Sequence, residues 1–271
     1  MSVLQLLPAH VIEGIVGYVA DEAAGASAKQ LLLVSHRWRR AALRHINREC
    51  TIDLRQQKAL GTITVSNKHE TWSFGVVDGV VEMDSRAEEL TANMAAHVRC
   101  LRIAVNVQDV FGGEAAKALE PAVRSGRLVC MRLRRLVFAL GNTAFVDADP
   151  VLARSSAERL SCWVSQMAPR ANDVALVETA GFNGLQKGSR SGPEMQQQSS
   201  GLHVELALRL LGRASHMDVC NLGPTYFADT WELGDRRLAS IRCRLDDGGH
   251  MAQVVRSSAP WLKTLTRSSG G

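Results

Sequence analysis

The sequence predicts an α/β protein in three parts: a short helical module in residues 1–50, a linker with a short β insertion in residues 51–96, and an irregular strand–helix repeat domain in residues 97–271. Three observations predict this organisation. Apolar residues recur at helical spacing near the N-terminus, β-favouring runs flank an Asp-Gly pair in the middle part, and a three-position apolar pattern recurs in the last part.

The composition is that of an ordinary globular protein. Of the 271 residues, 46% are hydrophobic and 22% are charged, and the formal net charge is +5. This apolar fraction excludes wholesale disorder and collagen-like or coiled-coil structure. The chain holds no uninterrupted run of about 18 apolar residues, so the sequence predicts no membrane-spanning helix.

The N-terminus and the cysteines indicate a protein of the cytoplasm or nucleus. The apolar stretch from Val3 to Ala20 is interrupted by Pro8, His10 and Glu13, and no Lys or Arg precedes it as a signal peptide requires. Six cysteines lie far apart without a Cys-x-x-Cys pair, which predicts free and mostly buried thiols. They are Cys50, Cys100, Cys130, Cys162, Cys220 and Cys243.

The segment after Pro8 has the spacing of an amphipathic helix. Its apolar stripe consists of Val11, Ile12, Ile15, Val16 and Val19. Pro8 suits the first turn, where its missing N–H would have no helical partner. Gly14 and Gly17 each weaken the helix by roughly 1 kcal/mol relative to Ala, so it depends on packing against a neighbour.

A second apolar run, Leu31 to Val34, leads into a further helix that Ser35 is suited to cap. Trp38, Ala42 and Ile46 mark its apolar side. Its other side is basic and carries Arg37, Arg39, Arg40, Arg44 and Arg48. Short helices within fifty residues bury little surface alone, so such a module depends on a partner or a neighbouring domain.

Together these residues resemble an F-box motif. The Leu7-Pro8 opening, the apolar helix and the closing Val34-Ser35 and Trp38-Arg39 pairs are similar to the family's Leu-Pro start and "Val-Cys-x-x-Trp-Arg" end. Ser35 stands where the family often has Cys. The match covers residues 4–50 and resembles the divergent F-box-like sequences of fungi.

The resemblance implies a three-helix module that docks on the small adaptor subunit of a cullin–RING ubiquitin ligase. In such an interface an amphipathic helix offers apolar anchors to a groove. The residues expected to bind the adaptor are Leu7, Pro8, Val11, Ile12, Ile15, Leu32, Val34 and Trp38. In the alternative interpretation, these helices only cap a repeat array.

The middle part favours β structure. Thr62 to Val65 and Trp72 to Val77 are rich in β-branched and aromatic residues, and Asp78-Gly79 is a strong type I′ hairpin signal. We therefore expect a short β insertion packed between the helical module and the remainder.

An apolar pattern at positions one, four and six recurs from residue 98. Its instances are Val98/Leu101/Ile103, Leu133/Leu136/Phe138, Ala171/Val174/Leu176, Ala214/Met217/Val219, Leu238/Ile241/Cys243 and the truncated Leu262/Leu265. Helical periodicity lies between them, in residues 114–124, 155–167, 202–211 and 251–262. We expect Pro121 to kink or shorten the first of these helices, and Ser155 with Glu158 to form a capping box at the second.

Strand, helix, strand is the repeat unit of a leucine-rich solenoid, and the arrangement resembles the degenerate leucine-rich repeats often found behind F-boxes. Asn106 stands where such a repeat places its ladder-forming Asn, and residues 186–201 are expected to form a loop. The expected fold class is therefore α/β, with a three-helix F-box-like module followed by an irregular leucine-rich-repeat-like solenoid. A compact α/β domain with a parallel sheet gives the same alternation and remains the alternative.

No constellation for catalysis, cofactor binding or metal binding is found in the sequence. Dinucleotide-binding, P-loop, Gly-x-Ser-x-Gly and His-Glu-x-x-His motifs are missing. Residues 181–188 lack P-loop spacing, Asp147 and Asp149 fit a turn, and Cys130 and Cys162 have no identifiable base. The sequence therefore predicts a protein that is not an enzyme and holds no cofactor.

The function expected is substrate recognition within an SCF-type ubiquitin ligase, with the N-terminal helices binding the adaptor and the repeats binding an unidentified target protein. One alternative is a non-catalytic repeat scaffold without a ligase link, and it predicts that deletion of residues 1–50 unfolds the remainder. Another is nucleic-acid binding through the Arg37–Arg48 face, with Arg132, Arg134 and Arg135 as a second basic cluster. Interspersed acidic residues and few aromatic residues disfavour nucleic acid, and no membrane partner is expected.

Overall fold

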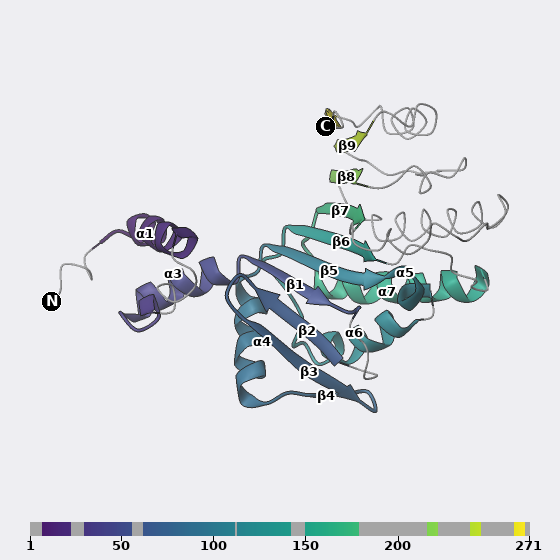
Figure 1. The fold of residues 1–271 in the computed structure, drawn as a ribbon, viewed down its shortest axis with the longest axis horizontal. Helices are drawn as coiled ribbons and strands as arrows, with labels where there is room; N and C mark the ends of the chain where they lie inside the picture. The colour runs from purple at the N-terminus through teal and green to yellow at the C-terminus, as the bar shows by residue number, and fades with distance from the viewer. Residues whose placement is uncertain are drawn as a thin grey trace, which may run out of the picture.

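One open sheet organises the protein. The computed structural model describes residues 7–22, 30–55, 62–111, 113–141, 150–178, 216–221, 239–244 and 263–268. Within these residues, ten strands form a single sheet in the order β10-β9-β8-β7-β6-β5-β1-β2-β3-β4 (Figure 1).

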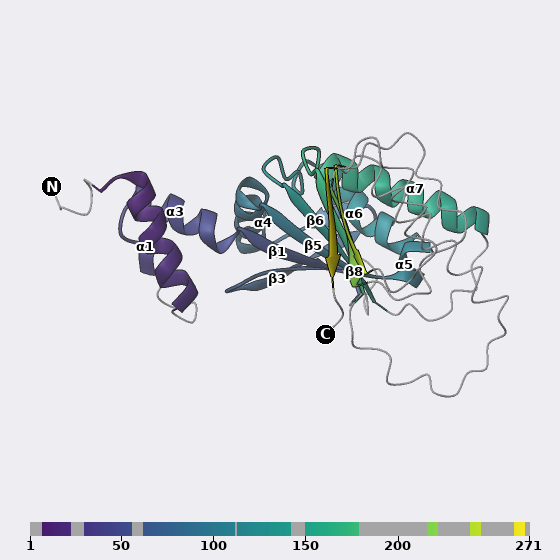
Figure 2. The ribbon, with the colours of Figure 1, turned by 90° about the horizontal axis from the view of Figure 1, so that it is seen from above.

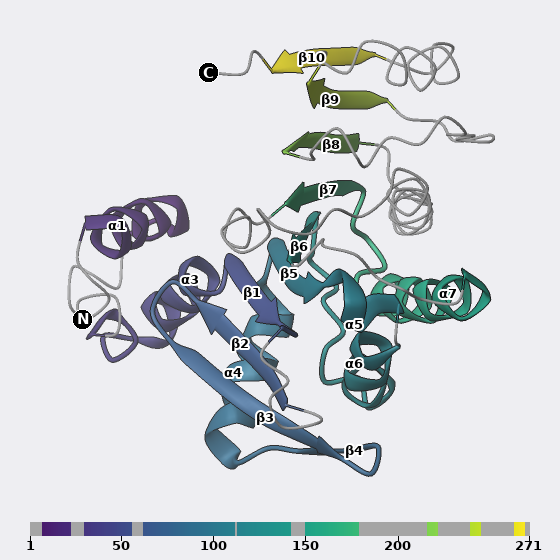
Figure 3. The same ribbon diagram turned by 45° about the vertical axis from the view of Figure 1, so that its right-hand side comes forward.

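Most of the sheet is parallel. The parallel strands are β1 (Glu49–Asp53), β5 (Cys100–Asn106), β6 (Arg135–Gly141), β7 (Asp173–Glu178), β8 (His216–Asn221), β9 (Ser240–Arg244) and β10 (Thr264–Ser268). An antiparallel meander of β2 (Thr62–Asn67), β3 (Thr71–Val77) and β4 (Val80–Glu82) extends the β1 edge. Figure 3 shows this meander and β7–β10 at opposite edges of the sheet.

The hairpin between β3 and β4 is confirmed. Asp78 and Gly79 have φ angles of 49° and 76°, and Val77 pairs with Val80 across the turn. A type I′ turn needs positive φ at both central residues, which Asp and Gly tolerate best.

The helices follow local signals. They are α1 (Ala9–Glu22), α3 (His36–Ile46), α4 (Ser85–His97), α5 (Val107–Phe111), α6 (Glu114–Arg124) and α7 (Pro150–Met167). The Asp84 carboxylate caps α4 by accepting a hydrogen bond from the Ala87 amide at 2.7 Å. Because α7 begins at Pro150, Ser155 lies inside it and the predicted capping box is wrong. Of the two effects expected of Pro121, a kink or a shortening, the shortening is wrong, since α6 continues through Pro121 to Arg124.

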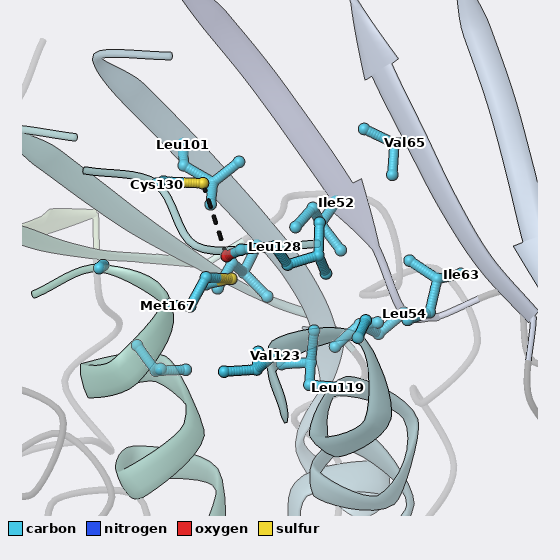
Figure 4. Close-up of a cluster of buried hydrophobic side chains, with 14 of the residues drawn as sticks. Ile52, Leu54, Ile63, Val65, Leu101, Leu119, Val123, Leu128, Cys130 and Met167 are labelled. Carbon is cyan, nitrogen blue, oxygen red and sulfur yellow. Dashed lines mark hydrogen bonds between the residues drawn. The ribbon is translucent and has the colours of Figure 1, made fainter. Parts of the chain in front are cut away.

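The helices α4, α6 and α7 cover one face of the sheet and enclose the main core (Figures 1 and 2). Alternate strand residues such as Ile52, Leu101 and Phe138 belong to this core and are almost fully buried. Figure 4 shows Ile52 and Leu101 in one cluster with Val123 and Met167 of the helices. The main core is therefore built where the strands and these helices meet.

The opposite face of the sheet carries polar residues and, on β5–β7, the almost fully buried Ala104, Ala139 and Ala175. Thr51, Arg102 and Ser66 of neighbouring strands lie on it, and no helix within the described residues packs against it. We call this surface the helix-free face.

The expected three-helix F-box-like module followed by a leucine-rich solenoid is wrong as a fold: the protein is an α/β fold with an open, mixed sheet. The apolar pattern does locate strands correctly, since each of β5–β10 begins two residues after the first position of an instance. However, any parallel sheet with buried strands produces that pattern. Asn106 also forms no ladder: its side chain donates to Asp109 Oδ2 at 2.9 Å, three residues along the chain.

The alternative of an α/β domain with a parallel sheet is closer to what is observed. The interval 51–96 supplies the antiparallel meander and α4 to the same sheet and core. Several predictions lie outside the described residues, namely the helices at 202–211 and 251–262, the loop at 186–201, the segment 181–188, and Asp147 and Asp149.

Candidate binding surfaces

The helices α1 and α3 form a unit with its own small core. Six buried residues make this core, with Leu7, Leu31 and Leu32 packed against it. The six are Ile12, Val16, Trp38, Ala41, Ala42 and Ile46. None of them belongs to the core beneath the sheet. Figures 1 and 2 accordingly show α1 and α3 standing off one end of the sheet.

Polar contacts hold the two helices together. The Pro8 carbonyl accepts hydrogen bonds from the Val11 and Ile12 amides, which starts α1 directly after the proline. Arg37 donates to the Leu7 carbonyl at 3.0 Å, and Arg44 pairs with Glu13 at 2.9 Å. Between the helices, hydrogen bonds from the Leu33 and Val34 amides to residues 30 and 31 form one helical turn.

The residues expected to bind the adaptor fall into three groups. Ile12 and Trp38 are 2% and 4% exposed, so they stabilise the helix pair from inside. The half-buried group consists of Leu7, Val11 and Leu32, and the exposed group of Pro8, Ile15 and Val34. Only the exposed group offers more than about a third of its surface to a partner, with Ile15 38% and Val34 47% exposed.

Two further exposed apolar side chains, Tyr18 and Leu33, were missed from the sequence. Tyr18 is 65% exposed and follows Ile15 by three positions, so both lie on one side of α1. Leu33 is 87% exposed and lies beside Val34 in the turn. Both were predictable from their positions in the apolar runs. We refer to Pro8, Ile15, Tyr18, Leu33 and Val34 as the exposed apolar set.

A network around Asn47 joins the helix pair to the sheet. Asn47 is 3% exposed, and its side chain donates to the Leu43 carbonyl at 3.1 Å and accepts from Asn67 of β2 at 3.1 Å. The Arg48 carbonyl accepts hydrogen bonds from the Arg99 and Cys100 amides at 2.9 and 3.0 Å. The chain between α3 and β1 is therefore hydrogen-bonded to β2 through Asn47 and to the start of β5 through Arg48.

A cavity of about 720 Å³ lies beside this junction. The end of α3 and strands β1, β2, β5 and β6 supply its lining. Arg48, Lys68 and Arg102 bring positive charge to it, while Glu49 brings negative charge. The cavity opens on the helix-free face, where a polar ligand or protein segment has access.

The thiols near this cavity are poor nucleophiles. Burial raises the pKa of Cys50 to about 12, with smaller contributions from Cys130 and Cys100. Burial, followed by Glu49, also raises the pKa of Cys100. Cys130, a nucleophile candidate from the sequence, has its pKa raised by burial to about 12. Thiolates are the reactive form, so these residues are suited to packing.

The other nucleophile candidate, Cys162, is exposed on α7, where its sulfur accepts a hydrogen bond from Gln166 Nε2 at 3.5 Å. In the described part of the chain, no group of three or more His, Cys, Asp or Glu side chains is placed to hold a metal ion. No described helix is long and apolar enough to cross a membrane.

Comparisons with protein-family models, with curated proteins and with solved structures find no match to this chain.

Proposed function

We propose that this protein is a non-catalytic substrate-recognition subunit of an SCF-type ubiquitin ligase. The α1–α3 pair would bind the adaptor subunit, and the helix-free face of the sheet would bind a target protein. One observation carries the proposal: a helical unit with its own core stands off the sheet and exposes apolar side chains. The resemblance of residues 4–50 to the F-box motif supplies the identity of the partner.

The distribution of exposed apolar residues supports docking at the helix pair. Among the described residues, four of nine exposed large hydrophobic side chains belong to it, namely Ile15, Tyr18, Leu33 and Val34. Burying a fully exposed side chain of this size contributes roughly 1.5–3 kcal/mol, and Leu33, at 87% exposed, comes nearest to that condition. A partner that covers the exposed apolar set therefore gains binding energy without unfolding either helix.

The proposed contact differs in one respect from the set expected from the sequence. Ile12 and Trp38 are already used within the helix pair, so they act by holding α1 against α3. Pro8, Ile15 and Val34 remain as direct contacts, joined by Tyr18 and Leu33.

The helix-free face supports the second half of the proposal. It carries polar strand residues and the cavity of about 720 Å³, and within the described residues no helix packs on it. A target held there would be kept near the catalytic subunits of the ligase, and the protein would act by raising effective concentration.

Co-purification with the adaptor subunit tests this function. The full chain is expected to retain the adaptor, and Leu33→Asp/Val34→Asp to lose it by at least about tenfold, because a charge is poorly tolerated in an apolar interface. Val151→Asp/Leu152→Asp is the matched control, since these two residues of α7 are adjacent and 73% and 64% exposed. This control should retain the adaptor.

Two outcomes would reject the proposal. One is failure of the full chain to retain the adaptor at all, and the other is equal retention by both double variants. Circular dichroism on each variant checks that the helices are intact, and Leu7→Ala/Pro8→Ala provides a second variant without added charge.

A further inference from the structure

Two basic clusters far apart in the sequence meet in the structure. A hollow of about 180 Å³ is lined by Arg44 and Arg48 of the first cluster and Arg132 of the second. Arg99 adds a fourth guanidinium to the lining, and His97 adds an imidazole; no sequence pattern singled out either residue. Glu13 is the acidic residue on this wall. We call this site the basic hollow.

The parallel sheet explains how part of the lining is positioned. Arg48 and Arg99 each precede a strand, β1 and β5, and these strands are neighbours. The Arg99 amide donates to the Arg48 carbonyl at 2.9 Å, so the two residues lie side by side. Neighbouring strands are about 4.8 Å apart, which brings the two side chains within reach of one small ligand.

Three of the four arginines that line the basic hollow have no carboxylate partner within the described residues, the exception being Arg44. In the described part of the chain, Arg48, Arg99 and Arg132 form no ion pair. Seven arginines elsewhere pair with carboxylates: Arg39, Arg55, Arg86, Arg124, Arg127, Arg135 and Arg159. The positive charge at the hollow is therefore largely uncompensated.

Two buried polar atoms also lack hydrogen-bond partners at this site. Arg44 pairs with Glu13 through one terminal nitrogen, but its Nε is buried and has no hydrogen-bond partner within the described residues. The Nδ1 of His97 is also buried and has no hydrogen-bond partner within the described residues. Buried polar atoms without partners are rare in native proteins, so the side chains of Arg44 and His97 have hydrogen-bonding capacity that a small rotation would turn toward a ligand.

The electrostatics of His97 agree with an excess of positive charge. Burial lowers the pKa of His97, and Arg132, Arg44 and Arg40 lower it further, while the backbone of Ala96 acts weakly in the opposite direction. His45, another imidazole on the wall, and Glu13 also face the hollow. A bound anion would offset the repulsion among the arginines that line the hollow.

We propose that the basic hollow binds a phosphate group, either free or as a monoester. Guanidinium groups match phosphate oxygens with paired N–H donors, and several of them can surround one tetrahedral anion. The volume of about 180 Å³ suits a single group of this kind. The residues that line it include no Phe, Tyr or Trp on which bases could stack, which disfavours single-stranded nucleic acid. The proposal does not rest on the proposed adaptor binding.

Calorimetric titration of the full chain with inorganic phosphate, at constant ionic strength set by chloride, tests the site. The wild type is expected to bind, and Arg99→Ala and Arg132→Ala each to weaken binding about tenfold, the effect of losing one charged hydrogen-bond pair. Both side chains are exposed, so the fold is expected to survive. Arg159→Ala, which removes a paired arginine on α7, is the control and should bind as the wild type does.

O-phosphoserine and single-stranded RNA serve as further probes. Tighter binding of O-phosphoserine than of inorganic phosphate identifies a phosphorylated side chain as the ligand, while the reverse identifies free phosphate. The proposal is overturned if phosphate binds no better than chloride, or if both alanine variants bind like Arg159→Ala. Arginine-dependent binding of RNA without binding of phosphate would also overturn it, in favour of a nucleic-acid surface.

Discussion

The helix pair and the sheet differ in how completely they bury their apolar residues. Among the described residues, the main core beneath the sheet contains 31 buried members from strands and helices, whereas the α1–α3 core contains six. Small units bury a smaller share of their surface, so side chains such as Tyr18 and Leu33 stay exposed. The comparison teaches that the sheet is stable by its own packing, while the helix pair is suited to gain stability from a partner.

The two regions are joined mainly by polar contacts. Besides the Asn47 network, an exposed ion pair links Arg39 of α3 to Glu89 of α4 at 3.3 Å. Exposed ion pairs contribute about 0–1 kcal/mol. The cores should therefore respond separately to mutation.

The largest expected effect comes from truncating one large residue in each core. Phe138→Ala is expected to destabilise the whole sheet by about 3–5 kcal/mol, because Phe138 is fully buried. Trp38→Ala should instead remove the protection of α1 and α3 while the strands stay protected. Hydrogen exchange read by peptide mass spectrometry distinguishes these patterns. Equal loss of strand protection in both variants would show that the two cores are one cooperative unit.

A smaller effect is expected within the sheet region at Thr91. The Trp72 indole donates to Thr91 Oγ1 at 3.0 Å, and both residues are buried. Thr91→Val keeps the shape but leaves the indole N–H without its acceptor, at a cost of about 1–3 kcal/mol. Urea denaturation followed by tryptophan fluorescence measures this loss in the free energy of unfolding. Thr71→Val, at an exposed position of β3, is the matched control and should change stability by less than about 0.5 kcal/mol. Equal stability changes in the two variants would show that the indole hydrogen bond contributes nothing.

The pH dependence of stability tests the junction between the regions. The pKa of His97 is lower in the folded chain than its ordinary value of 6.5, with burial as the first cause. Below about pH 6.5 the unfolded chain takes up the proton first, so His97 lowers stability as the pH falls. His97→Gln should lose less stability than the wild type between about pH 7 and pH 5 in denaturant titrations. Equal losses of stability in the variant and the wild type would mean that His97 does not contribute to the pH dependence.

The smallest expected effect is that of removing the helix pair. A chain that begins at Asn47 should keep the sheet folded, with its melting temperature within about 4 °C of the full chain, the shift that about 1 kcal/mol produces in a protein of this size. Thermal unfolding followed by far-ultraviolet circular dichroism measures this. Collapse of the sheet would favour the alternative in which the N-terminal helices act only as a cap.

Local features of this fold were predictable, and non-local ones were not. The apolar pattern located β5–β10, the Asp78-Gly79 pair located a hairpin, and periodicity located α6. The pairing of β1 with β5 joins residues about fifty positions apart and leaves no local signal. The solenoid was inferred from the alternation of strand and helix patterns and from the resemblance to degenerate leucine-rich repeats, and a parallel sheet shares that alternation.

The candidate surfaces show the same difference between local features, which were predictable, and non-local ones, which were not. Apolar runs identified Pro8, Ile15 and Val34, but burial of Ile12 and Trp38 depends on how α1 crosses α3. The convergence of the Arg48 and Arg132 clusters depends on strand order, so the sequence showed two clusters where the structure has one hollow.

Three backbone carbonyls that lie just before parallel strands limit where the chain can change in length. Those of Arg48, Arg99 and Arg134 each accept two amides from the start of the next parallel strand. Insertion of one residue just after Arg99 would turn Leu101 and Ile103 outward and Arg102 inward. Changes in chain length can therefore accumulate over evolution between the strands, but not at the points where the strands begin.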